Sequence, residues 1–591
     1  MMEPTGELAL AAEFPTPDRE QWRELVQGVL RKSGADFESL VTTTYDGIRV
    51  QPLYTAEDAA PATGFPGLPP YTRGGRPQGA VAGWDVRQQH AVADREAVMA
   101  DLENGVGSLW LKNLPADRLD DVLADVYLDL APVVVDAGAD FRESGLAMLR
   151  VWDQRPVLAG EVRGNVGADP LGVRARTGAA ADFAALHDLV RKARDFPDLR
   201  VVVVDGLPFH EAGGSDAQEL GASLAAGVAY LRELTEAGLS APEAVRLLEF
   251  RYAATADQFL TIAKFRAARR LWARVTEVVR APSPQLQHAV TSPAMMTRRD
   301  PWVNMLRTTI ACFGAGLGGA DAVTVLPFDH AIGLPDDFAR RIARNTQSLL
   351  LEESRLAGVI DPAGGSWYVE RLTDDLARAG WAWFREIEAA GGLPTAFPLV
   401  EERIAATWEA RSANLADRSD AITGVSEFPN LTEPAVHRDA APPEPSGGLP
   451  RVRYAQAFEA LRDAADAAPE RPVVFLATLG PVSAHTARAT FAANLFQAGG
   501  IATPSAGATK TVEDVVAKFR DSGARIACLC GSETSYAELA GPVADALRAA
   551  GAERILLAGK KSYATIDEYV FTGCPALRVL EHTFEFLGVQ R

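Results

Sequence analysis

The sequence predicts an α/β protein in which a (β/α)8 TIM barrel is followed by a smaller, doubly wound flavodoxin-like domain. Two observations lead to this prediction. Between about residues 80 and 330, eight short apolar runs alternate with helical patterns, which is typical of βα units around a closed parallel sheet. After a Pro- and Gly-rich stretch, five more short runs alternate with helical patterns over about 120 residues, which is typical of a doubly wound sheet.

Residues 1–79 are predicted to form an extended arm. It contains one amphipathic helix at 21–32, one strand at 47–55, and the Pro/Gly-rich run at 64–79. Such a segment is too small to bury a core of its own.

Residues 80–430 are predicted to form the barrel with trailing helices. The run LRVVVVDG at 199–206 is the clearest strand, because continuous β-branched residues suit a strand that is buried on both faces. Leu260, Ala267, Leu271, Val275 and Val278 lie on one face of a predicted helix that should pack on the barrel. The eight predicted strands are 82–88, 107–113, 132–138, 163–169, 199–206, 246–252, 286–292 and 321–327.

Beyond the barrel strands, Asp336 is a predicted N-cap for a helix that runs to Ser354. Residues 431–470 are predicted to be a linker, because prolines and glycines cluster there. Residues 471–591 are predicted to form the flavodoxin-like domain. Its five predicted strands are 472–480, 501–507, 524–532, 553–559 and 576–581.

Composition excludes several classes of protein. Basic residues number 59 and acidic residues 78, for a formal charge of −19, which argues against nucleic-acid binding. The four cysteines are too few and too scattered for a disulfide framework or a zinc site, so a reducing cytoplasm is expected. The N-terminus lacks the pattern of a secretory signal, and the longest uncharged stretch, Ala489–Thr509, is too polar and Gly/Pro-interrupted for a membrane span. No metal site is predicted.

Three glycines match a dinucleotide-binding pattern but lie in the wrong context. Gly314, Gly316 and Gly319 fit G-x-G-x-x-G, yet a helical pattern precedes them and a strand follows. A phosphate-binding loop needs the reverse order, so a helix-to-strand loop is the favoured interpretation. Cys528 and Cys530 lie two apart on a predicted strand, too stretched for an easy disulfide, and are interpreted as core residues.

Histidines supply the other candidate functional groups. His485 follows the first strand of the second domain, where a flavodoxin-like fold binds ligands; a solvated helix cap is the favoured alternative to a metal or cofactor ligand. His210 and Glu211 follow the fifth barrel strand, where barrel enzymes keep catalytic groups. They are interpreted either as an acid/base pair or as a structural loop histidine held by Glu211.

Several long stretches resemble the coenzyme-B12-dependent methylmalonyl-CoA mutase family, most closely its small, or beta, subunits. They are GLPFHEAGGSDAQELG, YLRELTEAGL, FLTIAKFRAARRLW, RDPWVNMLRTT, RRIARNTQSLLLEES, DPAGGSWYVE and ITGVSEFPN. In catalytic chains of this family, adenosylcobalamin generates a radical that allows succinyl-CoA and (R)-methylmalonyl-CoA to interconvert. The resemblance therefore implies an isomerase of propanoate metabolism.

The resemblance also identifies positions where this chain departs from the catalytic pattern. The family holds cobalt with the histidine of D-x-H-x-x-G, but here Val482, Ala484 and Ala487 occupy the Asp, His and Gly positions. The Tyr-His pair that brackets the thioester after the fifth strand becomes Leu207 and Pro208. Neither Leu nor Pro can donate a hydrogen bond through its side chain. Arg174 or Arg176 is left as a possible substitute for the family's substrate-carboxylate arginine.

These departures imply a non-catalytic small subunit of a heterodimer. Adenosylcobalamin and the acyl-CoA are then expected on the partner, a large (alpha) catalytic subunit, which the arm of residues 1–79 is expected to contact. This chain is expected to have no catalytic, cofactor-binding or metal residues of its own. One alternative is a self-sufficient acyl-CoA mutase that binds cobalamin through a displaced His485. Another is an NAD-linked oxidoreductase, which rests only on the glycines at 314–319.

Overall fold

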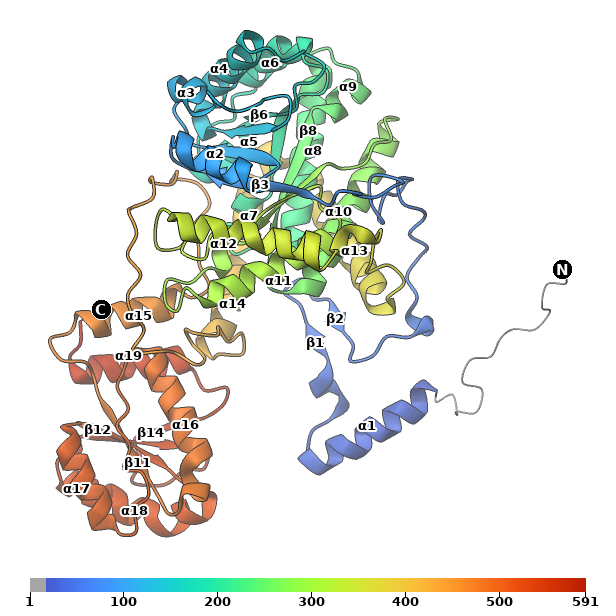
Figure 1. Cartoon of the computed structure of the whole chain (residues 1–591). Helices are drawn as coiled ribbons and strands as arrows, with labels where there is room; N and C mark the ends of the chain where they lie inside the picture. The colour runs from blue at the N-terminus through green and yellow to red at the C-terminus, as the bar shows by residue number, and fades with distance from the viewer. Residues whose placement is uncertain (1–17, 591) are drawn as a thin grey trace.

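The computed structural model describes residues 18–590. Figure 1 shows a barrel, a smaller sheet domain beneath it, and an N-terminal arm that ends in an isolated helix. The strand predicted over 47–55 is limited to Arg49–Val50, because Pro52 cannot donate to a ladder. The arm contains α1 (Arg19–Ser33), η1 (Phe37–Leu40), β1 (Thr42–Thr43), β2 (Arg49–Val50) and η2 (Ala56–Asp58).

Eight parallel strands close the barrel in the order β10-β3-β4-β5-β6-β7-β8-β9. All eight strands predicted from the apolar runs are present, and with them the predicted barrel. They are β3 (Asp85–His90), β4 (Ser108–Lys112), β5 (Val133–Asp136), β6 (Gly164–Ala168), β7 (Arg200–Asp205), β8 (Leu248–Ala254), β9 (Gln287–Thr291) and β10 (Ala322–Thr324). The strand β6 contains glycines where the other barrel strands have larger residues. At Gly167 the reason is steric, because a Cβ there would lie 1.7 Å from the carbonyl oxygen of Val135 on β5.

Helices surround this barrel and bury one face each. On α10 (Gln258–Val278) the predicted face is buried at Ala267, Leu271 and Val275, but Val278 is exposed because it is the last residue of the helix. The other helices of the ring are α2 (Arg95–Glu103), α3 (Leu119–Val122), α4 (Phe141–Gln154), α5 (Pro170–Thr177), α6 (Phe183–Lys192), α7 (Leu207–Glu211), α8 (Asp216–Glu236), α9 (Ala241–Arg246), α11 (Val303–Leu317) and α12 (Asp337–Ser348).

Asp336 caps α12 as predicted, because its Oδ1 accepts from the amide of Ala339 at 2.8 Å. The regular helix ends at Ser348 rather than Ser354, and Leu349–Glu353 form a π-helical turn. Two long helices follow, α13 (Trp367–Ala389) and α14 (Leu393–Ala416), and they pack on α8. None of the helices formed by residues 18–590 is long and apolar enough to cross a membrane.

The second domain is built on a parallel sheet in the order β11-β12-β13-β14. Residues 501–507 are not a regular strand, but they run beside β11 through bridges at Ala502 and Ser505. The elements are α15 (Gln456–Ala467), β11 (Val474–Thr478), α16 (Val482–Ala498), α17 (Val512–Ser522), β12 (Ile526–Cys530), α18 (Glu533–Ala549), β13 (Arg554–Ala558), β14 (Glu568–Val570) and α19 (Ala576–Leu587).

One predicted strand of this domain is wrong. Residues 576–581 begin α19, and the last strand is instead β14, which the sequence did not indicate. The buried residues Ala576, Val579, Leu580, Thr583 and Phe584 recur at helical spacing, so a longer window shows period 3.6 where a six-residue window resembles a strand. α15 lies within the segment predicted as linker and contributes Phe458, Leu461 and Ala465 to the core of this domain.

Candidate functional site

The candidate site is the barrel mouth, formed by the carboxyl ends of the barrel strands. Arg251 at β8 donates through Nη1 to Asp136 at 2.7 Å and to Asp205 at 3.0 Å. Arg176 donates to the same Asp205 oxygen at 2.7 Å. Burial alone would raise the pKa of Asp136, but the neighbouring cations Arg251, Arg176 and Lys112 lower it to about 2. The mouth is therefore a network of buried, mutually neutralised charges.

Leu207 and Pro208 lie in the first turn of α7 at this mouth, and both are buried. Leu207 borders a gap of only about 10 Å³, whose other walls include Trp110 and Arg451. A space of this size holds about one water molecule. The side chains of Leu207 and Pro208 carry no hydrogen-bond donor, and the gap beside Leu207 has no room for a substrate.

Residues 437–452, which we call the strap, cross the barrel mouth. Glu444 accepts from Lys112 Nζ at 2.7 Å and forms an ion pair with Arg451 Nη1 at 3.2 Å. Arg451 Nε in turn donates to Glu211 at 2.6 Å. The sequence predicted only a linker here, because prolines and glycines indicate that a segment is neither helix nor strand but do not indicate what it packs against. The charged residues between those prolines were the feature of the sequence that could have suggested contacts with the barrel.

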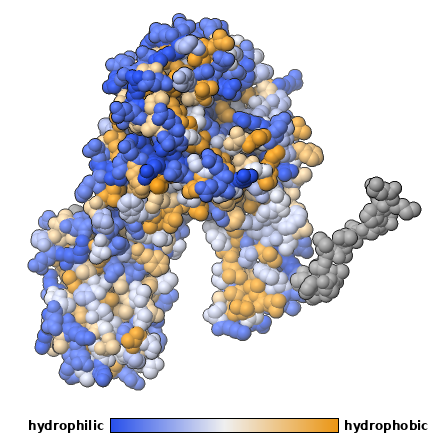
Figure 2. Space-filling model, in the orientation of Figure 1, coloured by the Kyte–Doolittle hydropathy of each residue, from blue (hydrophilic) through white to orange (hydrophobic). Residues whose placement is uncertain are grey.

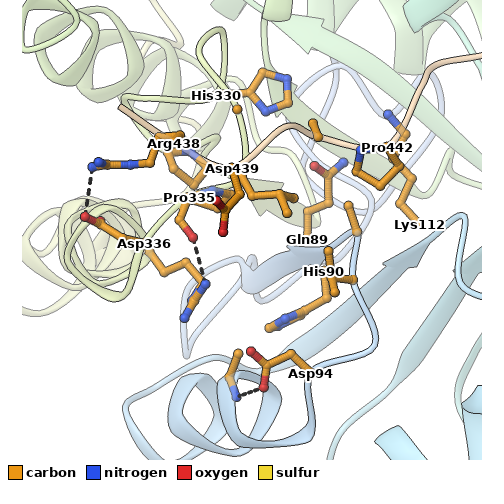
Figure 3. Close-up of a pocket in the computed structure, with 18 of the residues that line it drawn as sticks. Gln89, His90, Asp94, Lys112, His330, Pro335, Asp336, Arg438, Asp439 and Pro442 are labelled. Atoms are coloured by element: carbon orange, nitrogen blue, oxygen red, sulfur yellow. Dashed lines mark hydrogen bonds and ion pairs between the residues drawn. The ribbon is translucent and has the colours of Figure 1, made fainter. Parts of the chain in front are cut away.

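Two cavities flank the strap. The smaller, of about 560 Å³, is shown in Figure 3. In that view His330, Gln89 and Lys112 surround the open space from the barrel side, and Arg438, Asp439 and Pro442 border it from the strap. The larger cavity, of about 900 Å³, lies over β4 to β8 on the other side of Pro442 and Glu444.

The larger cavity is acidic. Only three cations line it, Lys112, Arg176 and Arg251, and each is paired with a carboxylate. Burial and the neighbouring charge of Asp205 raise the pKa of Asp169 to about 7. A negatively charged ligand would therefore be disfavoured there. The carboxylates of the lining are Asp117, Asp136, Asp140, Glu143, Asp169, Asp205 and Glu444.

His210 and Glu211 do not form a pair, so the acid/base interpretation is wrong, and the structural interpretation is wrong in its choice of Glu211 as the partner. The Nε2 of His210 lies 2.6 Å from Ser292 Oγ, and its nearest carboxylate is Glu219 at 3.9 Å. Glu211 binds Arg451 instead. Burial, and then the charge of Lys264, lower the pKa of His210 to about 3. A histidine that stays neutral and enclosed in this way is a structural residue.

The two candidate arginines of the barrel point in different directions. Arg176 faces the larger cavity, but Asp205 already occupies its guanidinium. Arg174 donates to the carbonyl oxygen of Pro394 and stacks on Phe397, 4.4 Å from the ring centre. Arg174 is therefore directed away from the barrel mouth, toward α14.

In the second domain, Val482, Ala484 and Ala487 lie on the first turns of α16 and carry no metal-binding atom. His485 is only 6% exposed, and its Nδ1 lies 3.2 Å from the carbonyl oxygen of Gly480. It is thus a buried residue rather than the solvated cap favoured by the sequence. Throughout residues 18–590, no three His, Cys, Asp or Glu side chains are arranged to hold a metal ion.

The remaining sequence motifs have structural roles. Gly314 and Gly316 lie in the last turns of α11, and Gly319 belongs to the loop that leads into β10, so the predicted helix-to-strand order is confirmed. Cys528 and Cys530 are free and fully buried in β12, as expected of core residues.

Exposed apolar side chains are found on the arm and on helix α11 of the barrel. α1 has no buried residue, and Leu25 and Val29 are 73% and 66% exposed. Leu306 and Ile310 of α11 line a cavity of about 610 Å³, and residues 42–46 of the arm form part of its wall. Figure 2 shows the arm and the second domain as two projections with a hollow between them, and an apolar surface on the arm.

Comparison with known proteins identifies relatives over the whole length of the chain. The profile of the methylmalonyl-CoA mutase family matches residues 106–468. A methylmalonyl-CoA mutase small subunit from Streptomyces virginiae is 58% identical, with 99% of each chain covered. The corresponding small subunit from Propionibacterium freudenreichii subsp. shermanii is 39% identical over 99% of this chain and 97% of the relative. Methylmalonyl-CoA mutase from Escherichia coli K12 is 30% identical over 69% of this chain and 64% of the relative.

Proposed function

The chain belongs to the methylmalonyl-CoA mutase family, and we propose that it is the non-catalytic small subunit of an adenosylcobalamin-dependent methylmalonyl-CoA mutase. It acts as one half of a cytoplasmic heterodimer. Its large partner subunit binds adenosylcobalamin, which supplies the radical chemistry, and the acyl-CoA substrate. The interconversion of succinyl-CoA and (R)-methylmalonyl-CoA takes place on that partner, and this chain contributes subunit packing.

The observation that carries the proposal is the chemistry at the cobalt-ligand position. A methyl group stands there at Ala484, and the Asp position that would orient an imidazole holds Val482. These residues do not fit a cobalamin held by histidine. The competing hypothesis, in which His485 binds cobalt, is disfavoured because that imidazole is buried against the backbone of Gly480.

The barrel supports the same conclusion independently. The gap beside Leu207 is too small for a thioester, and Arg251 with Trp110 fills the barrel axis beneath it. The larger cavity carries an excess of carboxylates, whereas acyl-CoA substrates bear several negative charges. Binding of the substrate to this barrel would therefore be opposed by both steric clashes and electrostatic repulsion.

The arm supports a partner-binding role. Although Trp22 contacts Phe37, no residue of α1 is buried, so the exposed apolar side chains of this helix would be stabilised by a cover from outside the chain. Leu306 and Ile310 extend the same kind of surface to the barrel. We propose that the large subunit covers both surfaces by seating in the hollow of Figure 2.

The decisive experiment compares this chain alone, the large subunit alone and the co-expressed pair. The isolated small subunit should stay colourless after incubation with adenosylcobalamin and dialysis, and should show no turnover, whereas the pair should bind one cobalamin. Bound corrinoid with turnover by this chain alone would refute the proposal. In the pair, Leu25→Asp with Val29→Asp should weaken association at least tenfold, because two charges would enter an apolar contact. Gln27→Asp, an exposed substitution on the same helix, is the matched control.

A further inference from the structure

The strap is fixed to the barrel at both of its ends. At its start, the carbonyl oxygen of Asp439 accepts from the amide of Leu334 at 2.8 Å, and Arg438 pairs with Asp329 and Asp336. At its end, three amides donate to barrel carbonyls at 2.7 to 3.1 Å: Gly448 to Arg176, Leu449 to Ala175 and Val452 to Glu211. Both ends thus have backbone partners.

The middle of the strap is held differently. Within the stretch 440–447, all of which is described, Glu444 alone makes a hydrogen bond or an ion pair. Pro442, Pro443 and Pro445 have no amide hydrogen and a fixed φ, so this stretch is stiff and cannot bond to the barrel through those residues. A single carboxylate therefore fastens a stiff bridge between two anchored ends.

Glu444 lies where its contact with Lys112 separates the two cavities beside the strap. Lys112, Pro442 and Glu444 line both cavities, so the strap is the wall between them. Glu444 also borders the gap of about 10 Å³ above Leu207. Movement of residues 440–447 away from the barrel would join the cavities of about 560 Å³ and 900 Å³ and uncover the mouth.

We propose that the strap is a hinged cover over the barrel mouth and that Glu444 is its latch. The closed state is the one described here, with Glu444 fastened between Lys112 and Arg451. The open state keeps both anchored ends and swings residues 440–447 outward. The cover gives the barrel of this subunit two states, closed and accessible, and this inference does not depend on the identity of the partner.

The electrostatics of the latch favour the closed state. Although burial opposes ionisation, the charges of Lys112 and Arg451 hold the pKa of Glu444 below its usual value. Among residues 18–590, Glu444 is the hydrogen-bonding partner of Lys112, whereas Arg451 also has Glu211. Loss of Glu444 therefore leaves Lys112 without its ion pair. Charge-assisted hydrogen bonds of this kind are strong enough to shift an opening equilibrium about tenfold or more.

The test places a reporter thiol beneath the cover in the full-length chain. Leu207→Cys puts the thiol in the gap under Glu444, and the four native cysteines are buried. The rate of labelling by a small maleimide then reports opening. In this background, Glu444→Gln should accelerate labelling of Cys at 207 about tenfold. Asp439→Asn, which neutralises a strap carboxylate without a side-chain partner, should leave the rate unchanged.

A second variant tests whether faster labelling results from loss of this contact rather than from general destabilisation of the fold. Lys112→Met should accelerate labelling to a similar extent, and combining it with Glu444→Gln should add little, because both remove the same contact. Far-ultraviolet circular dichroism and the Tm of each variant should match those of the parent reporter. Equal labelling rates in the Glu444→Gln and Asp439→Asn chains would overturn the proposal. So would labelling of the parent reporter at the rate of an exposed thiol, because the mouth would then be open already.

Discussion

The guanidinium of Arg251 lies 4.2 Å from the ring centre of Trp110, inside the barrel. Arg251 stands on β8 and Trp110 on β4, so the contact spans the barrel rather than neighbouring strands. Asp136 on β5 and Asp205 on β7 bind the same guanidinium. One side chain thus ties four strands together across the interior of the barrel.

We expect Arg251→Met to lower the free energy of unfolding by about 3–5 kcal/mol, because it leaves two buried carboxylates without their shared cation. Urea denaturation at pH 7 measures the change. Arg232→Met is the matched control, since that ion pair with Glu388 is largely exposed and should cost below about 1 kcal/mol. Similar losses for the two variants would contradict the structural importance of the barrel network.

Arg269 holds the root of the arm against the bottom of the barrel. It is buried, and burial lowers its pKa to about 9. It donates to the carbonyl oxygens of Tyr71, Thr72, Gly318 and Gly319 and to Gln287 Oε1. Removing it leaves several buried acceptors unsatisfied, each of which costs about 1–3 kcal/mol.

Arg269→Ala should therefore increase amide hydrogen exchange over residues 68–76 and 316–321 by at least tenfold. Arg269→Lys should rescue little of the protection, because an ammonium has three donors and no planar fork. The exposed neighbour Arg274, changed to Ala, serves as the control on the same helix. Protection of residues 68–76 that survives in Arg269→Ala would show that other contacts anchor the arm.

His210 should make the protein acid-sensitive. Its pKa is about 3 when folded, because burial disfavours the charged ring, and about 6.5 when unfolded. The unfolded chain therefore binds the extra proton below pH 6.5, and the stability contributed by neutral His210 is lost as pH falls from 6.5 toward 3. The slope of this loss approaches about 1.4 kcal/mol per pH unit once the pH is well below 6.5.

Raised carboxyl pKa values oppose this trend in the whole protein. Burial raises the pKa of Glu219 to about 7 and that of Asp46 to about 6, so these groups add stability as pH falls toward 4. The informative quantity is consequently the difference between variants. Between pH 6.5 and 5.5, His210→Gln should lose about 1 kcal/mol less than the parent chain in urea unfolding. A parental slope in His210→Gln would disprove the burial argument.

The barrel was predictable because each of its strands corresponds to a short apolar run that can be recognised in the sequence by itself. Continuous apolar runs such as 199–206 need no knowledge of distant contacts, and parallel strands with crossover helices follow from their spacing. α19 was misassigned because ALRVLE alone fits both periods, and only the residues after it resolve the choice. The local pattern of apolar residues distinguishes a helix from a strand only when it is followed over a long enough stretch of sequence.

The site was less predictable, because it depends on contacts between distant residues. The sequence shows directly that the side chains of Leu207, Pro208 and Ala484 carry neither a hydrogen-bond donor nor a metal ligand. The closure of the barrel mouth was not visible, since Glu444 meets Lys112 across 332 positions of sequence. His210 and Glu211 are adjacent in sequence, yet their side chains bind different partners, Ser292 and Arg451.

Restoring the cobalt-ligand motif should not by itself create a mutase. In the variant Val482→Asp, Ala484→His, Ala487→Gly, the new imidazole would stand on the first turn of α16 with a carboxylate nearby. Cobalamin binding can be followed by the shift of the corrinoid absorbance. Turnover is expected to stay undetectable in the absence of a partner, because Leu207 and Pro208 still supply no hydrogen-bond donor and the gap beside them still excludes a thioester. Measurable isomerisation by this triple variant alone would show that the barrel is competent, and the non-catalytic role would then have to be abandoned.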